Sequence, residues 1–595
     1  MAQGGGGVDQ VINSFMAPIS KWLFKFVFVG VGLEDWSGDP ILDKSGNQIE
    51  LPLILLWLVL GALFFTVRFG FLNFRKLGLA FRTVKGKYSK ADDPGEITHF
   101  QALTAALSAT VGLGNIAGVA IAVSIGGPGA VFWMVLAGTL GMTSKFCECT
   151  LGVKYREIVD GKVFGGPMHY LKKGFAERDM KGLGKVLATL FAVTCVGAAF
   201  GGGNMFQANQ SCQQLLSVIE SKEHLEANKN LVILTKKKEE MTAHYVKVDL
   251  LEKDLKALQA KVEESDALGW EAEEANEELR HVSSLLESEK ANYAAQSARL
   301  SEIDTELKAA KLEVEKTKGF FSKQRWVFGA ILATLVGLVI IGGIAGIAKV
   351  TERLVPVMTA VYIIGCVIVL FANFSDIGAA FYQIFTEAFV PTAVGGGLIG
   401  VFIQGIRRSA FSNEAGFGSA PIAHAAVKTR YPASEGLVAL LEPFMDTVVV
   451  CTMTGLAIVV TAPDHGYNAE EGIELTSSAF VTVIPWFQYV LLACVVLFAF
   501  STMISWSYYG QQAWAFLFGK SRSLELIYKM IFCLFIVIGS SMSLGAVLDF
   551  SDGMLFMMSL FNLIGVYVLL PVVKREFEKF SNFAEKVDQG GSLDD

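Results

Sequence analysis

Long apolar segments separated by short polar ones run through most of the chain. Eleven of them are long and apolar enough to span a bilayer, at 51–72, 99–127, 130–152, 183–217, 326–348, 353–374, 378–427, 435–462, 480–518, 524–548 and 552–573. The two longest, 378–427 and 480–518, must be broken, tilted or extended beyond the bilayer. An amphipathic segment at 8–30 precedes them and is expected to lie on the membrane surface. The pattern predicts an all-α integral membrane protein with eleven transmembrane helices.

A long polar segment at 220–318 interrupts this pattern. Its only glycine is Gly269, and apolar residues recur at intervals of three and four on both sides of that glycine. Such spacing is typical of a heptad seam, so we predict an inserted antiparallel coiled-coil hairpin with its tip near Gly269. Two interpretations of its role stay open. It docks a protein partner, or it is a tolerated insertion without one.

Lysine and arginine gather in alternate connections. Basic clusters follow the first and third spans, and others lie at Arg407, Arg408, Lys428 and Arg430, at Lys520 and Arg522, and at 574–579. The connections at 37–50 and 463–475 are acidic or neutral. Because basic loops stay in the cytoplasm, we predict that the N-terminus and the hairpin lie outside and the C-terminus in the cytoplasm.

These observations divide the chain into five predicted regions. Residues 1–50 form an N-terminal amphipathic segment on the outer side, and 51–217 form the first part of the transmembrane domain. Residues 218–322 form the hairpin, 323–575 the second part of the transmembrane domain, and 576–595 a cytoplasmic tail.

Composition supports a membrane protein and excludes other classes. Hydrophobic residues make up 52% of the chain and charged residues 18%, against about 25% charged residues in soluble domains. The formal net charge of -7 argues against nucleic acid as a partner. Cys147 and Cys149 lack a second Cys/His pair that would complete a metal site, so we interpret them as buried hydrophobes. We interpret His99, His169 and His424 as interfacial, and the sequence predicts no enzyme.

Glycines and an asparagine interrupt the 99–127 segment at its centre, in TVGLGNIAGVA at 110–120. Irregular backbone at membrane depth survives only where it is buried in protein or lines a cavity. A second break, VPTAVGGGLIG at 390–400, lies in a segment of opposite predicted direction. Paired breaks in two halves of a chain are typical of inverted-repeat transporters, whose freed backbone groups hold substrate and ion. The alternative is close helix packing through G-x-x-x-G, which GNIAG at 114–118 also fits.

Polar side chains mark two further spans. FAFSTMISWSYYG at 498–510 carries hydroxyl groups suited to Na⁺, and GGGNMFQANQS at 201–211 carries three amide side chains. Each cluster alone would also serve for hydrogen bonds between helices. Four broken or polar spans together favour one central binding site. Four carboxylates also lie in or near spans: Glu387, Glu414, Glu442 and Asp446. An interfacial position would explain Glu414 and Glu442, and proton coupling through one of the four stays open.

Several motifs resemble the alanine or glycine:cation symporter family. They include FSNEAGFGSAPIAHAA at 411–426, ATVGLGNIAGVAIAVSIGGPGAVFWM at 109–134, FGGPMHYLKKG at 164–174 and AKVTERLVP at 348–356. The resemblance runs from about 50 to 575 and excludes the insertion. It implies a LeuT-type five-plus-five inverted repeat preceded by one extra helix. It also implies Na⁺-coupled uptake of a small neutral amino acid, alanine or glycine, across the bacterial inner membrane.

The resemblance also implies roles for individual residues. The substrate carboxylate would be held by Gly112, Gly114 and Asn115. The amino acid would contact Asn204 and Gln207, and Trp506 would limit the size of the pocket. The coupling ion Na⁺, the sole cofactor implied, would bind the carbonyls of Ser108 and Val111 and the hydroxyls of Ser501 and Thr502.

The sequence therefore favours a secondary active symporter that works by alternating access in the lipid bilayer. The alternative is a membrane amino-acid sensor that signals through the hairpin. Retained candidate ligands such as Ser501, Thr502 and Asn115 disfavour a sensor, which needs no coupling ion. A channel is disfavoured because paired breaks occur without a ring of repeated filter residues. The sequence does not decide whether the substrate is alanine, glycine or serine, or whether the coupling ion is Na⁺ or H⁺.

Overall fold

The computed structural model describes residues 8–33, 48–220, isolated positions between 223 and 259, and residues 273–389, 397–467 and 472–593. The chain divides into two compact units. The larger unit comprises Gly7–Leu33, Ile49–Val218 and Gln324–Asp595, and the smaller one Met1–Gly6, Glu34–Gln48 and Ile219–Lys323.

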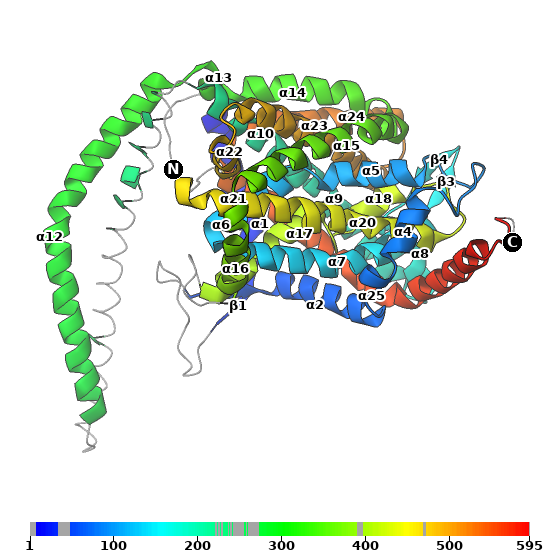
Figure 1. Ribbon diagram of the computed structural model, residues 1–595, viewed down its shortest axis with the longest axis horizontal. Helices are drawn as coiled ribbons and strands as arrows, with labels where there is room; N and C mark the ends of the chain where they lie inside the picture. The colour runs from blue at the N-terminus through cyan, green and yellow to red at the C-terminus, as the bar shows by residue number, and fades with distance from the viewer. Residues whose placement is uncertain are drawn as a thin grey trace. The chain divides into compact units, whose positions relative to one another are not determined.

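Helices build almost all of the described larger unit, and its long helices lie side by side in a bundle (Figure 1). Its first half contains α1 (Val8–Val27), α2 (Leu53–Arg68), α3 (Leu72–Arg75), α4 (Leu77–Val84), α5 (His99–Thr110), α6 (Val119–Gly126), α7 (Gly129–Lys154), α8 (Pro167–Ala176), α9 (Lys181–Phe200) and α10 (Phe206–Ile219). Two π-helical turns join these helices, η1 (Gly114–Gly118) and η2 (Gly201–Met205).

The second half of the larger unit contains α14 (Arg325–Ile340), α15 (Gly343–Ala372), α16 (Ile377–Glu387), α17 (Gly397–Asn413), α18 (Ala420–His424), α19 (Pro432–Ala439), α20 (Leu441–Pro443), α21 (Thr452–His465), α22 (Ile473–Val481), α23 (Phe487–Phe518), α24 (Arg522–Ser541) and α25 (Leu544–Asp588). A 3-10 turn, η3 (Phe374–Asp376), and a π-helical turn, η4 (Phe444–Cys451), complete it. Two short antiparallel pairs of strands join β1 (Gly30–Gly32) to β2 (Glu50–Pro52) and β3 (Glu157–Val159) to β4 (Lys162–Phe164).

Seven described helical segments are long and apolar enough to cross a membrane: Gly129–Lys154, Lys181–Ile219, Gly343–Ala372, Pro432–Pro463, Phe487–Phe518, Arg522–Ser541 and Leu544–Asp588. A bent pair, His99–Thr110 with Gly114–Gly126, makes an eighth if it counts as one span. Helices α2 and α14 are apolar but shorter. The protein is therefore a multi-pass, helical membrane protein. The number of eleven crossings stays a prediction.

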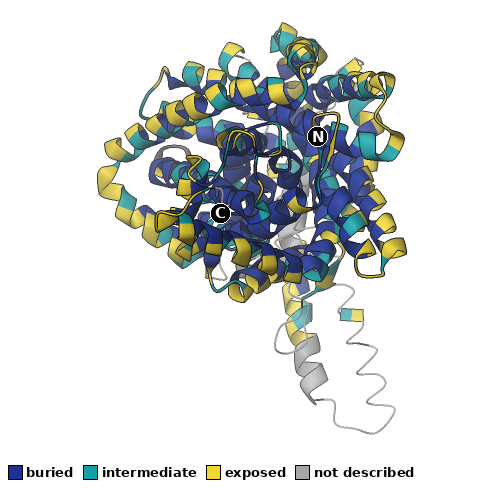
Figure 2. Cartoon of the chain, turned by 90° about the vertical axis from the view of Figure 1, so that its right-hand side faces the viewer, coloured by how far each residue is buried: buried dark blue, intermediate teal, exposed yellow. Residues whose placement is uncertain are grey.

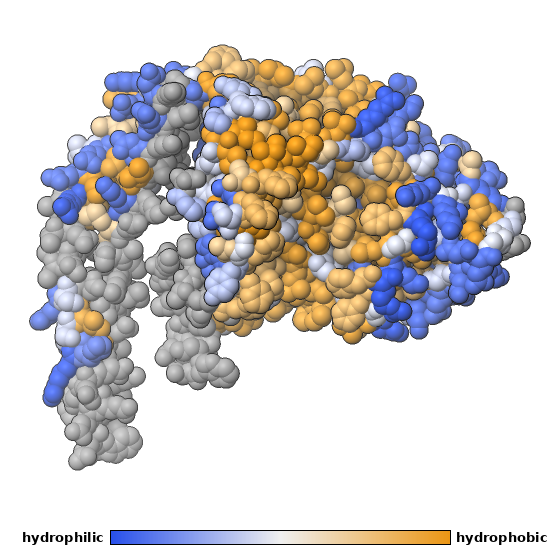
Figure 3. Space-filling view, in the orientation of Figure 1, coloured by the Kyte–Doolittle hydropathy of each residue, from blue (hydrophilic) through white to orange (hydrophobic). Residues whose placement is uncertain are grey.

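Apolar side chains cover the flank of the helical bundle, and hydrophilic ones gather at the end that carries β3, β4 and the C-terminus (Figure 3). Exposed residues of this apolar surface include Leu338, Ile341 and Phe371. Buried residues fill the interior of the same bundle (Figure 2). A helical bundle with an apolar outer face and a packed core fits a lipid surrounding.

The predicted break at 110–120 is confirmed. Helix α5 ends at Thr110, three irregular residues follow, and the α5 and α6 directions differ by 50° across the break. The second predicted break, at 390–400, lies mostly outside the described residues, and 397–400 form the first turn of α17. The π-helical turns η1 and η2 coincide with the glycine-rich motifs. Such turns are rare and occur frequently at functional sites.

The charge pattern predicted that Arg407 and Arg408 mark a cytoplasmic loop, and this prediction is wrong. Both lie inside α17, and both guanidinium groups pair with Asp552 of α25. Arg408 and Asp552 are almost fully buried. Because a buried carboxylate compensates their charge, these arginines carry no information on topology. Lys428 and Arg430 do follow α18 in an irregular connection.

Helix α1 packs against the bundle with one face, which refines the prediction of a surface segment. Leu23 is buried against Gly553 of α25, and the Phe28 and Phe556 rings lie 5.1 Å apart at an edge-to-face angle. The other face presents exposed aromatic residues such as Trp22. This face suits the interface of a membrane, where aromatic side chains gather.

The smaller unit contains α12 (Glu273–Thr317) and α13 (Phe320–Lys323). Apolar residues of α12 pack against an earlier part of the insertion, and the two sets are Leu307, Ala310 and Val314, and Ala227, Leu231 and Leu234. Lys238 pairs with Asp304 at 2.6 Å in the same region. The spacing on both sides is three or four residues, but the tip near Gly269 lies outside the described residues. The coiled-coil hairpin therefore stays a prediction.

Candidate functional site

Side chains satisfy the backbone groups that the break after α5 sets free. The N–H of Gly112 donates to Asn115 Oδ1 at 2.9 Å, and the N–H of Leu113 donates to Gln207 Oε1 at 3.4 Å. A side chain at position 112 would collide with Thr502 Oγ1 of α23. Position 112 therefore requires glycine because the backbone approaches α23 closely. The two N–H groups and their side-chain acceptors lie at a buried point between α5, α10 and α23.

A second group of polar side chains surrounds Asp446 in η4. Asn115 donates to the carbonyl of Asp446 at 3.0 Å and to its Oδ1 at 2.7 Å. Oδ2 of the same carboxylate accepts from Ser412 at 2.7 Å and from Thr447 at 2.9 Å. All four residues are buried. Asn115 thus bridges the break and η4, and Asp446 fixes its orientation.

Three of the four residues predicted to bind Na⁺ contact one another, but the Ser501 hydroxyl itself donates to the Phe498 carbonyl at 2.9 Å. The Thr502 hydroxyl donates to the Ser108 carbonyl at 3.1 Å, and the Ser108 hydroxyl donates to the Ser501 carbonyl at 2.7 Å. Val111, the fourth, is buried at the end of α5 and begins the break. This arrangement gathers carbonyl and hydroxyl oxygens beside the broken helix.

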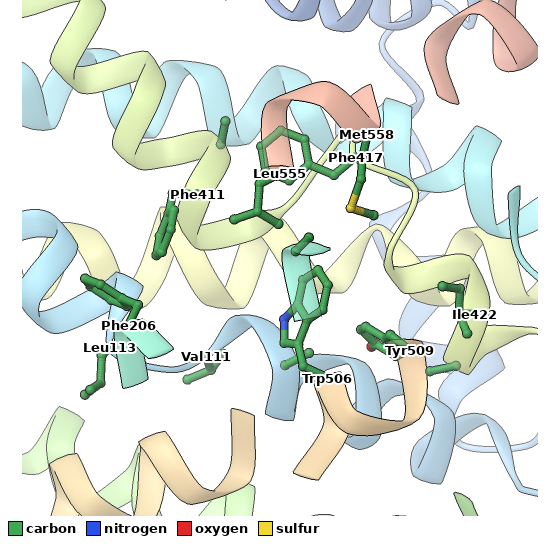
Figure 4. Close-up of a cluster of buried hydrophobic side chains, with 14 of the residues drawn as sticks. Val111, Leu113, Phe206, Phe411, Phe417, Ile422, Trp506, Tyr509, Leu555 and Met558 are labelled. Atoms are coloured by element: carbon green, nitrogen blue, oxygen red, sulfur yellow. The ribbon is translucent and has the colours of Figure 1, made fainter. Parts of the chain in front are cut away.

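A cavity of about 250 Å³ lies beside these groups. Its lining comes from five parts of the chain and consists of Ala109, Thr110, Gly114, Gly202, Gln207, Phe411, Glu414, Thr502, Trp506 and Leu555. Figure 4 shows Phe411, Leu555 and Trp506 around the same space, each from a different helix.

Glu414 supplies the carboxylate in this lining. Its Oε1 accepts from Trp506 Nε1 at 2.9 Å, and its Oε2 accepts from the Ser419 hydroxyl. The residue is buried and has a positive φ of 56° directly after α17. A left-handed conformation is uncommon for a residue with a side chain and often marks a functional position. The cavity therefore has a buried carboxylate in its wall, hydrogen-bonded to Trp506.

The structure separates the predicted substrate ligands into three groups. Gly114, Gln207 and Trp506 line the cavity. Gly112 and Asn115 lie behind its wall, in the hydrogen bonds around the break. Asn204 is turned toward α24, where its amide donates to the Phe532 carbonyl at 2.9 Å. A packing contact therefore occupies the amide nitrogen of Asn204, whereas its Oδ1 has no hydrogen-bond partner among the described residues, so its role at the substrate stays a prediction.

The sequence did not place Phe411, Glu414 and Asp446 at the site. The FSNEAG motif at 411–416 contained the first two and was the available signal. The sequence also allowed Glu414 to lie at the membrane interface without a role in binding, but the side chain is buried and lines the cavity. Asp446 was noted as an acidic residue near a span, but nothing in the local pattern linked it to Asn115, which is 331 positions away.

Two of the three histidines interpreted as interfacial are deeply buried. His99 has 3% of its surface exposed and His424 none, and both contact the carboxylate of Glu435. Cys149 and Glu442 also lie near His424, with one ligand atom of each of the three within 4.8 Å of the others. Because Glu442 already binds His424 and the ammonium of Lys145, this group does not favour a metal cation.

Comparison with known proteins decides the family. The model of the sodium:alanine symporter family matches residues 37–236 and 303–592. The chain belongs to the sodium:alanine symporter family. The whole segment left out between the two matched parts, 237–302, lies inside the polar insertion, so the insertion sets this symporter apart from the family model.

Relatives of this symporter extend over nearly its whole length. It is 32% identical to the sodium/alanine symporter AgcS of Methanococcus maripaludis over 91% of its own chain and 97% of that protein. It is 30% identical to an uncharacterized transporter of Haemophilus influenzae, over 89% and 93% of the two chains. The probable sodium/glutamine symporter GlnT of Bacillus subtilis is 29% identical over 90% and 88%.

Family membership confirms the resemblance found in the sequence. This symporter is a cation-coupled amino-acid transporter with several membrane-crossing helices, and it is not an enzyme. Nothing in the comparisons supports the sensor alternative.

Proposed function

We propose that this symporter couples inward Na⁺ flow to the uptake of alanine or glycine by alternating access around the cavity at Glu414. The observation that carries the proposal is the position of a small cavity between a broken helix and a buried carboxylate. Phe411, Leu555 and Trp506 line the cavity with large apolar side chains. The relative named a sodium/alanine symporter supports the same substrate class.

The amino acid would bind with its two charged groups toward opposite walls. Its carboxylate would face the broken helix near Gly114, where the start of a half-helix favours an anion. Its ammonium would face Glu414, whose two oxygens have lone pairs beyond those used by Trp506 and Ser419. Asn115 and Gln207 would hold the broken backbone in place.

Na⁺ would bind between α5 and α23. Its ligands would be the carbonyls of Ser108 and Val111 and the hydroxyls of Ser501 and Thr502. The hydrogen bond from Thr502 to the Ser108 carbonyl already brings two of these oxygens together at 3.1 Å. A cation placed there would replace this bond with two oxygen contacts. The membrane potential would contribute about 2.3 kcal/mol per charge per 100 mV.

We infer the fold of the larger arrangement from the family resemblance, and its orientation from the sequence pattern. The helices would form a LeuT-type five-plus-five inverted repeat preceded by one extra helix, in the bacterial inner membrane. The N-terminus and the inserted hairpin would lie outside and the C-terminus in the cytoplasm, as the distribution of Lys and Arg indicates. The hairpin would be available for a protein partner on that side.

Uptake of radiolabelled amino acids into proteoliposomes tests the proposal. Na⁺, K⁺ and proton gradients are imposed separately, and alanine, glycine, serine and glutamine are compared. We expect concentrative uptake of alanine or glycine with a Na⁺ gradient and little with K⁺. Uptake that ignores Na⁺ would refute the coupling. Absence of uptake of every amino acid would favour the sensor alternative.

A further inference from the structure

A continuous chain of hydrogen bonds connects the edge of the larger unit to its interior. We call it the histidine–glutamate chain, and its members in order are Ser89, His99, Glu435, His424, Glu442 and Lys145. Ser89 is half-buried, and the other five side chains have at most 3% of their surface exposed. The chain is separate from the cavity lining and from the candidate Na⁺ ligands.

Each histidine uses both ring nitrogens in this chain. Nε2 of His99 lies 2.7 Å from Ser89 Oγ, and its Nδ1 contacts Glu435. Nδ1 of His424 lies 2.5 Å from Glu435, and its Nε2 lies 2.5 Å from Glu442. The second oxygen of Glu442 accepts from Lys145 at 3.1 Å.

The geometry at His424 requires a bound proton. A neutral imidazole donates from one nitrogen only, and an ionised carboxylate cannot donate at all. Two carboxylates on opposite sides of the ring are therefore both hydrogen-bonded only if the ring carries both protons or one of the carboxylates is protonated. In each case the Glu435–His424–Glu442 segment carries one extra proton, compared with a neutral His424 ring and two ionised glutamates.

Other ionisable groups also face this segment from the elements packed around it. Helix α7 contributes Glu148 and Cys149 besides Lys145, and the end of α17 contributes Glu414. Arg156, which follows α7, interacts electrostatically with Glu435, and Tyr509 of α23 interacts with Glu442. The segment therefore lies among charges of both signs, and its own proton balances the two carboxylates together with Lys145.

The chain joins the elements that would have to move during transport. His99 begins α5, which leads to the break at Gly112, and His424 ends α18, which follows Glu414. Glu435 and Glu442 belong to α19 and α20, and Lys145 belongs to α7. A movement of α5 or α18 away from α7 and α19 would break the chain and expose its charged groups to water.

We propose that the histidine–glutamate chain is a proton-binding site linked to transport. It binds one proton when these helices are together and releases it on the Ser89 side when they part. This inference rests on the alternating access of the proposed function. On release, the proton moves from His424 to Glu435 and from Glu435 to a water molecule that enters on the Ser89 side as the helices part, so that only N–H and O–H bonds are exchanged.

The direction of the pH dependence follows from this assignment. The assembled chain holds one more proton than the parted chain, so acid favours the assembled form and alkali the parted form. A one-proton linkage changes the ratio of the two forms by at most about tenfold per pH unit. A histidine in water titrates near pH 6.5, so the dependence begins above about that pH.

Counterflow of radiolabelled alanine in proteoliposomes tests the inference, with equal Na⁺ and equal pH on both sides, from pH 6.0 to 8.5. We expect the wild-type rate to rise with pH above about 6.5, by up to about tenfold per unit. His424→Gln removes the titrating ring, and Glu435→Gln offers His424 Nδ1 an amide donor that suits a neutral ring. Both variants should show flat profiles. His169→Gln is the matched control, because His169 is also buried beside a carboxylate, Glu157, but outside the chain.

The outcomes separate this inference from the proposed function. A flat wild-type profile overturns the inference, and so does a His424→Gln profile as steep as that of the wild type. If His424→Gln does not fold, the slope of Glu435→Gln decides in the same way. Calorimetric titration with alanine in buffers of different ionisation enthalpy gives the protons exchanged, and an equal number for wild type and Glu435→Gln also overturns it. Absence of Na⁺-dependent counterflow at every pH refutes the proposed function instead.

Discussion

Replacing Gly112 by alanine adds one methyl group beside the candidate Na⁺ ligand Thr502, and this change tests the site directly. A Cβ atom built on Gly112 lies less than 3.0 Å from Thr502 Oγ1, closer than Cβ atoms approach other heavy atoms. Thr502 is buried and β-branched, so its hydroxyl escapes only by a rotation that breaks its bond to the Ser108 carbonyl. Gly112→Ala should therefore strain the packing and disturb the candidate Na⁺ site together.

The magnitude follows from these two contributions. Overpacking a well-packed interior costs about 1–3 kcal/mol, and the lost hydrogen bond adds about 1 kcal/mol. Gly112→Ala should thus lower the free energy of unfolding by about 2–4 kcal/mol. If half of this falls on the Na⁺-bound state alone, the Na⁺ concentration for half-maximal uptake rises about tenfold, since 1.4 kcal/mol is a factor of ten.

Thermal unfolding in detergent and Na⁺-dependent uptake measure the two effects. Gly346→Ala in α15 is the matched control, because nothing lies within 4 Å of a Cβ at that position, and it should be neutral or slightly stabilising. Gly112→Ala combined with Thr502→Ala removes the colliding hydroxyl and should recover stability without recovering Na⁺ affinity. A Gly112→Ala protein with wild-type stability and wild-type Na⁺ dependence would refute the contact between α5 and α23.

Three further predictions concern other parts of the site and the chain. Ser501→Ala with Thr502→Ala should raise the Na⁺ concentration for half-maximal uptake by tenfold or more, and an unchanged value would remove both hydroxyls from the ion site. Phe411→Ala should enlarge the cavity and admit larger neutral amino acids such as glutamine, which competition for alanine uptake measures; an unchanged substrate profile would place Phe411 outside the pocket. Replacement of 222–318 by a short Gly/Ser loop should preserve uptake, whereas a folded but inactive protein would show that the insertion takes part in transport.

Local sequence information was sufficient where the physical cause is local. The break at Gly112–Asn115 could be predicted, because glycines and an asparagine inside an apolar segment are unfavourable unless the backbone is used. The contact of Ser108 with Ser501 and Thr502 was implied by family resemblance only, since nothing in either segment specifies its partner. The same resemblance placed Asn204 at the substrate, whereas the structure turns its amide toward α24.

The sequence does not reveal the buried partner of a charged or ionisable side chain when that partner lies far away along the chain. Arg408 lies 144 positions before Asp552, and His99 lies 336 positions before Glu435. In the sequence, an arginine beside a span indicates a cytoplasmic loop and a histidine near a helix end indicates an interface. For Arg408 a buried partner overturns the interpretation, because it compensates the charge and makes burial tolerable, whereas the interfacial depth of His99 stays a prediction.

The sequence by itself determined that this chain is a helical membrane protein, that one span is broken at its centre, and that its motifs are those of a cation-coupled amino-acid symporter. Hydrophobic length and glycine placement are properties of single segments and can be read along the chain. Only the tertiary structure decided that Glu414 lines the cavity, that Asp446 orients Asn115 and that His424 lies between two glutamates. These facts depend on which helices meet, and helix contacts are fixed by the packing of the whole bundle.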